Sequence, residues 1–137
     1  MWWPHERGGA LNEAVRRHFD SLAGAGRLGP GPGRVVSGAA GSRSQGTEVR
    51  FEWRVDGGRI VEARFQAYGC PYTLAACDWL AGQLAGRGRE APWPGGPEAW
   101  AGALGIPLER LGRLLVVEDA LRATLKAWGP GSGNAVC

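Results

Sequence analysis

The sequence predicts an α+β fold in which a three-stranded antiparallel sheet is packed on one face by helices. Residues 34–68 carry strand patterns, while the segments before and after them have apolar residues at the three- and four-residue intervals of helices. Because the two patterns are segregated along the chain, we expect α+β topology in the order α-β-β-β-α-α-α-α. A chain of 137 residues is long enough for one domain with an adequate core.

The first helix is expected over residues 11–22, followed by a Gly- and Pro-rich segment at 24–33 that ends it. Its apolar face consists of Leu11, Ala14, Val15, Phe19 and Leu22. His18 lies near this face. We interpret it as a packed, hydrogen-bonded side chain rather than a metal ligand.

Three strands follow, at residues 34–40, 48–55 and 60–68, with a polar loop expected at 41–46. The second strand alternates apolar and charged side chains at every position, which indicates a half-buried strand. Asp56-Gly57-Gly58-Arg59 is typical of a hairpin turn. The second and third strands should therefore form an antiparallel hairpin.

The remaining helices are expected at residues 71–85 and 97–104, as a short turn at 106–110, and at 114–128. A loop at 86–96 holds Trp93. We expect one domain over residues 11–128, with a loose N-terminal tail at 1–10 and a flexible C-terminal tail at 129–137.

Gly69-Cys70-Pro71 joins the third strand to the following helix and is the candidate functional junction. Proline suits the first helical position, so Cys70 should lie at the helix N-cap. Unpaired backbone N–H groups and the helix dipole there favour the thiolate form of a cysteine, which ligates metals and attacks electrophiles. The alternative is that Cys70 is a small buried apolar residue.

The composition excludes several classes of protein. A net charge of +3, with scattered arginines, does not indicate a nucleic-acid interface. Three cysteines without framework spacing favour a reducing compartment over a disulfide-stapled domain. We see no signal peptide and no apolar run of membrane-spanning length, so a soluble cytoplasmic protein is expected.

Four segments of the chain resemble the IscU/NifU-type iron–sulfur cluster assembly scaffolds. They are NEAVRRHF at residues 12–19, VDGG at 55–58, ARFQAYGC at 63–70 and EDALRA at 118–123. The resemblance extends over about residues 11–128 and implies an IscU/SufE-like fold. It also implies that the chain binds iron or an iron–sulfur cluster. It further implies protein partners from iron–sulfur cluster biogenesis, such as a cysteine desulfurase.

In that family three cysteines hold the nascent cluster, aided by an aspartate and a histidine. The resemblance places the second cysteine at Cys70, where it is retained. The first cysteine and the aspartate fall on Gln45 and Thr47, and the histidine and third cysteine fall on Gly112 and Arg113. Cys70 is therefore the one retained ligand position.

These replacements remove soft anionic donors. Iron–sulfur clusters are held by thiolates, glutamine is a neutral donor, and arginine has no acceptor. Cys77 lies too far along the helix to replace a ligand and is expected in the core, while Cys137 is close to the chain end. We predict that no cluster is stably bound. Gln45 and Arg113 are expected beside the Cys70 sulfur in a metal-free pocket.

Three functions remain open at this point. The first is a scaffold-like protein of iron–sulfur cluster assembly, and the second is a metal-free binding module that keeps a partner-facing surface. A thiol enzyme using Cys70 is the least favoured, because no histidine is placed as a base, so we expect no enzyme. Exposed tryptophans in expected loops, namely Trp2, Trp3 and Trp93, would favour the module unless they fill the core.

Overall fold

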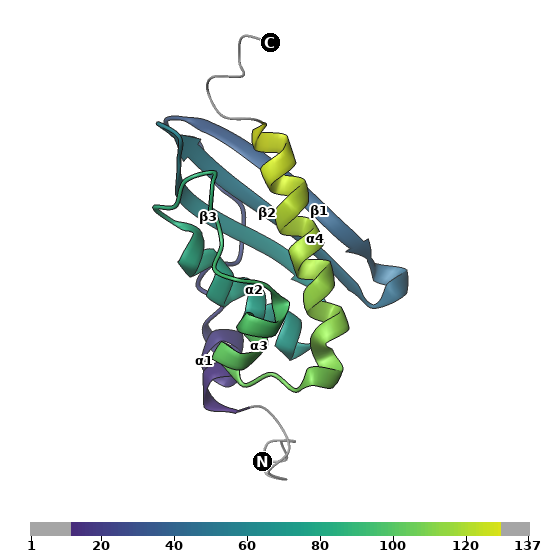
Figure 1. Cartoon of the computed structure of the whole chain (residues 1–137). Coiled ribbons are helices and arrows are strands. Elements are labelled where there is room, and N and C mark those ends of the chain that lie inside the picture. The colour runs from purple at the N-terminus through teal and green to yellow at the C-terminus, as the bar shows by residue number, and fades with distance from the viewer. Residues whose placement is uncertain (1–11, 130–137) are drawn as a thin grey trace.

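The computed structural model describes residues 12–129 and has the predicted α+β architecture (Figure 1). The order of one helix, three strands and then helices is confirmed. The expected N-terminal tail at 1–10 lies outside the described residues, as does the expected C-terminal tail at 129–137 except for Gly129. The elements are α1 (Glu13–Ser21), β1 (Arg34–Ser42), the 3-10 helix η2 (Arg43–Gln45), β2 (Thr47–Asp56), β3 (Arg59–Tyr68), α2 (Pro71–Leu84), α3 (Pro97–Leu104), the 3-10 helix η3 (Leu108–Arg110) and α4 (Leu111–Trp128).

The sheet has the order β1-β2-β3, and both neighbouring pairs are antiparallel. The turn between β2 and β3 contains Gly57 and Gly58, both with positive φ (62° and 79°), which is the backbone that tight hairpins need. The predicted hairpin is therefore confirmed. Val49, Phe51 and Trp53, on one face of β2, are fully buried, as the alternation predicts.

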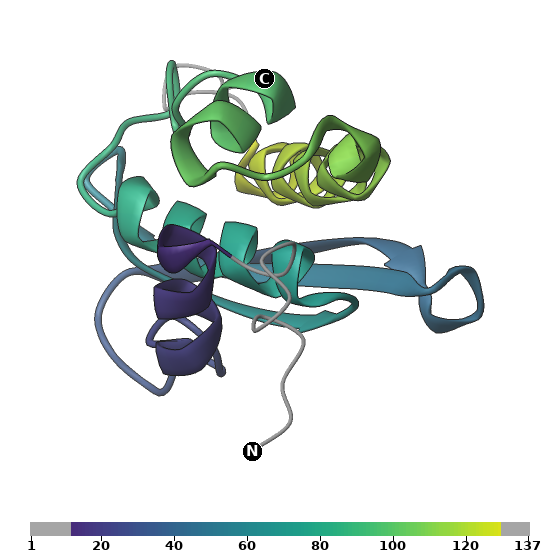
Figure 2. The ribbon, with the colours of Figure 1, turned by 90° about the horizontal axis from the view of Figure 1, so that it is seen from below.

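Helices cover one face of this sheet (Figure 2). The last helix, α4, packs across β1 and β2, while α2 packs against β3 and is itself contacted by α1. The core between these layers is mainly aliphatic and aromatic. No helix of the described residues is long and apolar enough to cross a membrane.

The segment at residues 24–33 starts at the edge of β3, where Ala25 pairs with Phe65, and then crosses the opposite face of the sheet, an arrangement that its composition did not predict (Figure 2). Beneath it Glu52 and Arg54 are only 4% and 6% exposed. Glu52 accepts a hydrogen bond from the Leu28 backbone N–H at 2.9 Å and from the Arg27 side chain at 3.2 Å. Arg54 donates to the carbonyl groups of Pro32 and Gly29. Both buried charges thus have partners, without which their burial would be costly.

We expect Glu52 to make folding sensitive to acid. Burial alone raises the pKa of the Glu52 carboxyl, but the Leu28 N–H and the guanidinium groups of Arg27 and Arg50 outweigh it and lower the pKa. A lowered carboxyl pKa stabilises the folded state above the unfolded pKa, and this contribution is lost as the pH falls through the folded pKa. The urea midpoint of the wild type should therefore fall more steeply below about pH 5 than that of Glu52→Gln.

Glu48→Gln is the matched control, because Glu48 is on the same strand with a side chain 46% exposed. It should leave the wild-type pH profile nearly unchanged. If the urea midpoints of the wild type and Glu52→Gln fell in parallel as the pH is lowered, the acid sensitivity would not come from Glu52.

Three local expectations need correction. The first strand continues to Ser42, and η2 replaces most of the expected polar loop, because β1 stays paired with β2 until Ser42 meets Thr47. The last helix starts at Leu111, directly after η3, rather than at residue 114. Trp93 is not an exposed anchor: it is partly buried, with its ring 6.5 Å from that of Trp53. Trp2 and Trp3 lie outside the described residues.

Candidate functional site

Cys70 occupies the junction that the sequence predicts, between the end of β3 and the start of α2. It is the N-cap of α2 with an extended backbone (φ −77°, ψ 167°), and Pro71 begins the helix. The Sγ atom of Cys70 lies 3.4 Å from Oγ1 of Thr73, within hydrogen-bond distance for sulfur. The side chain is partly exposed, so a reagent or partner can approach it.

The four substituted positions come together at one end of the sheet. Gln45 ends η2, Thr47 begins β2, and Gly112 and Arg113 lie in the first turn of α4. All four line one shallow cavity of about 260 Å³, together with Glu109 and Val116. The structure therefore brings the neighbouring residues Gln45 and Thr47 together with the start of α4, which is distant along the chain.

Arg113 is anchored inside this cavity. Its Nη1 donates a hydrogen bond of 2.8 Å to Oγ1 of Thr47, a residue that is only 3% exposed. The contact joins α4 to the start of β2 across 66 positions of sequence. The guanidinium group of Arg113 thus lies where the resemblance expects a thiolate. The hydroxyl of Thr47 lies where it expects a carboxylate.

The strand register brings Cys70 to the same end of the sheet. Glu48 pairs with Tyr68, so the chain leaves β3 towards Cys70 beside the point where Thr47 begins β2. Cys70 is not among the residues that line the 260 Å³ cavity. Its sulfur contacts Thr73, and Arg113 contacts Thr47. The expected contact of Gln45 and Arg113 with the Cys70 sulfur stays a prediction.

The donors gathered here do not suit an iron–sulfur cluster. Within residues 12–129, no group of three or more His, Cys, Asp or Glu side chains is placed to hold a metal ion. Arg113 offers only donors, and the Gln45 amide is neutral. Clusters are held by several thiolates, whereas in the part of the chain that the structure describes this end of the sheet contributes the one thiol of Cys70. Cys137 lies outside the described residues.

Cys77 is a core residue, as expected. Its side chain is fully buried, and burial, with a smaller contribution from the Asp78 charge, raises the pKa of its thiol. A thiol held in the neutral form is a poor metal ligand and nucleophile. Cys77 therefore adds nothing to the site at Cys70.

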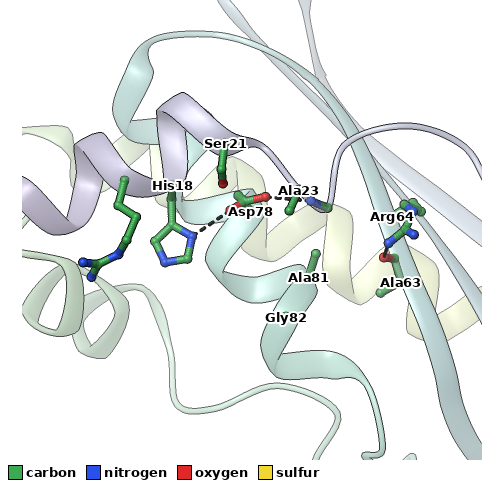
Figure 3. Close-up of a pocket in the computed structure, with 10 residues that line it drawn as sticks. His18, Ser21, Ala23, Ala63, Arg64, Asp78, Ala81 and Gly82 are labelled. Atoms are coloured by element: carbon green, nitrogen blue, oxygen red, sulfur yellow. Dashed lines mark hydrogen bonds and ion pairs between the residues drawn. The ribbon is translucent and has the colours of Figure 1, made fainter.

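The sequence did not reveal a second group, in which His18 of α1 meets Asp78 of α2 (Figure 3). His18 Nδ1 donates to Oδ2 of Asp78 at 2.7 Å, and the Gly24 backbone N–H donates to Oδ1 at 2.8 Å. The interpretation of His18 as a hydrogen-bonded side chain is confirmed. The sequence did carry a signal for this pair, because Asp78 is the one charged residue in the otherwise uncharged α2.

Comparisons with known proteins agree with this architecture. Residues 11–128 match the family model described as the NifU-like N terminal domain. Iron–sulfur cluster assembly protein 1 of Arabidopsis thaliana is 26% identical over 117 residues, covering 84% of this chain and 70% of that protein. The iron–sulfur cluster assembly scaffold protein IscU of Haemophilus influenzae is 25% identical over 117 residues, covering 85% of this chain and 93% of that protein.

A solved structure has the same fold. The crystal structure of the N-terminal part of a nitrogen-fixing NifU-like protein from Brucella abortus superposes with a TM-score of 0.63. The superposition covers 85% of this chain and 92% of that chain, at 16% sequence identity. At this identity the similarity establishes the fold.

Proposed function

This chain belongs to the family of NifU-like N-terminal domains, and we propose that it is a scaffold-like protein of iron–sulfur cluster assembly that cannot hold a stable cluster by itself. The cluster is the cargo of such a scaffold. Family membership supports a role in iron–sulfur cluster assembly. The substituted site supports the restriction, namely that the chain cannot hold a stable cluster by itself. The proposal assigns the chain no enzymatic activity.

One observation carries the restriction. Arg113 occupies the cavity where the family resemblance places a cysteine ligand, and its guanidinium is held there by Thr47. A fixed positive charge repels a metal cation, and arginine is never deprotonated in proteins. Loss of a thiolate donor and gain of a cation therefore both act against cluster binding at the same position.

A surface beside this site supports the second function, a binding module for a cysteine desulfurase or another component of the same process. Leu108 of η3 is 71% exposed and Leu115 of α4 is 49% exposed. Both lie close in sequence to Gly112 and Arg113 of the candidate site. Leucines with this much exposed surface leave apolar area that the monomer does not cover and that a protein partner can bury.

Anaerobic reconstitution tests the restriction. After incubation with ferrous iron and sulfide and removal of excess reagents, the wild-type chain should lack the visible sulfur-to-iron charge-transfer absorption of a bound cluster. Iron analysis of the same sample should give far less than one iron per chain. A stable, stoichiometric cluster on the wild-type monomer would contradict the proposal.

Binding and transfer experiments on the wild-type chain distinguish the two functions. A colourless chain that binds a purified cysteine desulfurase in calorimetry, with weaker binding after Leu108→Ser and Leu115→Ser, would support the binding module. A colourless chain that takes up iron or a cluster only transiently, and passes it to an acceptor protein, would support the scaffold-like function.

A further inference from the structure

A cavity of about 440 Å³ lies away from Cys70, between α1, α2 and the middle of β3 (Figure 3). Arg17, His18 and Ser21 come from α1, and Asp78 comes from α2. The chain at Ala23 and Gly24 and the side of β3 complete the lining. The volume falls in the range of pockets that bind small molecules.

Asp78 fixes the polar wall of this cavity. Its two carboxylate oxygens accept hydrogen bonds from the Gly24 N–H and from Nδ1 of His18, so the carboxylate is satisfied and the imidazole is oriented. Nε2 of His18 has no hydrogen-bond partner within residues 12–129 and lies on the side of the ring away from Asp78 (Figure 3). When the ring is protonated, this nitrogen is an additional donor for a ligand.

The charges around the cavity are mainly positive. Asp78 is the one acidic residue of its lining, against the guanidinium groups of Arg17 and Arg64. Arg64 is paired with Glu62 at 2.9 Å. Arg17 is exposed and has no ion-pair partner among the described residues. The α1 side of the cavity therefore presents an uncompensated guanidinium beside an oriented imidazole.

The floor of the cavity is formed by small apolar residues, Ala63 of β3 and Ala81 and Gly82 of α2. These contribute an apolar part of the lining that carries no polar side chain. A ligand that matches both parts has an apolar body and an acidic head.

We propose that this cavity is a binding site for a small organic anion. Its carboxylate or phosphate group binds Arg17 and, on the protonated imidazole, the Nε2–H of His18, and its apolar body rests on Ala63, Ala81 and Gly82. Asp78 is a positioning residue, since it holds the imidazole without contacting the ligand. The proposal is independent of any cluster at Cys70.

Phenyl phosphate is the probe, followed by two-dimensional amide NMR on the full chain at constant ionic strength. We expect saturable shifts at His18, Gly24 and Ala81, with a Kd on the order of 1 mM. Benzyl alcohol, which lacks the charge, should bind more weakly, as should inorganic phosphate, which lacks the ring. Arg17→Gln should weaken phenyl phosphate binding about tenfold through loss of a charged hydrogen bond.

Arg16→Gln is the matched control, because it removes the same charge from the neighbouring position of α1, and Arg16 does not line the cavity. It should change the Kd by less than about twofold, since a charge that does not line the cavity makes no direct contact with the ligand and is screened by salt. Equal weakening by the two variants would overturn the proposal, as would the absence of saturable shifts at the cavity. His18→Gln, checked for folding by circular dichroism, should also weaken binding.

Discussion

The double variant Gln45→Cys/Arg113→Cys is expected to acquire a stable iron–sulfur cluster upon anaerobic reconstitution. It restores thiols at the two positions where the family resemblance expects a cysteine, at the end of the sheet where β3 leads to Cys70. It also removes the guanidinium that Thr47 now holds. Three soft anionic donors, without the guanidinium of Arg113 among them, are the conditions that clusters favour. Bound iron should rise from near zero to about two per chain, the content of a [2Fe–2S] cluster, with visible charge-transfer absorption.

Two controls isolate the position of the new thiols. Arg16→Cys/Arg122→Cys adds the same number of cysteines at α1 and α4 positions outside the candidate site and should stay colourless. Adding Cys70→Ser to the Gln45→Cys/Arg113→Cys variant should remove most of the absorption, because one of three thiolates is lost. If a correctly folded double variant binds no more iron than Arg16→Cys/Arg122→Cys, these positions do not form a cluster site.

Gly38→Ala is expected to be strongly destabilising. Gly38 lies in the middle of β1, where α4 crosses the sheet, and a Cβ atom there would overlap the backbone of Ala123 and Thr124. Backbone atoms of a packed helix cannot move aside locally, so α4 would have to shift on the sheet. Overpacking of this kind costs about 3 kcal/mol, a large share of the roughly 5–15 kcal/mol that stabilises a domain. Urea denaturation followed by circular dichroism measures the loss.

Gly82→Ala is the matched control for this prediction. Gly82 is in α2, and a Cβ atom there meets nothing within 4 Å. The exchange should stabilise the protein by roughly 0.5–1 kcal/mol, because alanine has a higher helix propensity than glycine. A Gly38→Ala protein as stable as the wild type would mean that α4 does not pack on β1 as closely as the structure has it.

Much of the fold follows from local patterns. The alternation in β2 and the Gly57-Gly58 turn define the hairpin, since each depends on residues that are neighbours along the chain. The N-cap position of Cys70 likewise follows from Gly69 and Pro71 on either side of it. The boundary of β1 was less predictable, because its last residues are kept extended by pairing with β2 rather than by their own composition.

The substituted site divides in the same way. The sequence alone determines which side chains are available as ligands at this site. The family resemblance assigns the ligand positions to Gln45, Thr47, Gly112 and Arg113, and none of these residues can supply a thiolate. The sequence does not determine that Arg113 bonds to Thr47. That contact depends on how α4 is placed against the start of β2, which no local pattern encodes.

Trp93 and Asp78 show the same limit. Trp93 lies in an expected loop, and only packing against Trp53 decides that it is covered. Asp78 is marked by its sequence as a lone charge in an apolar helix, but only the approach of α1 to α2 gives it His18 as a partner. Periodicity and turn chemistry act over a few residues, so they determine the elements of this protein. Contacts between distant residues depend on how those elements pack, so the anchored arginine and the His18–Asp78 cavity were decided by the tertiary structure.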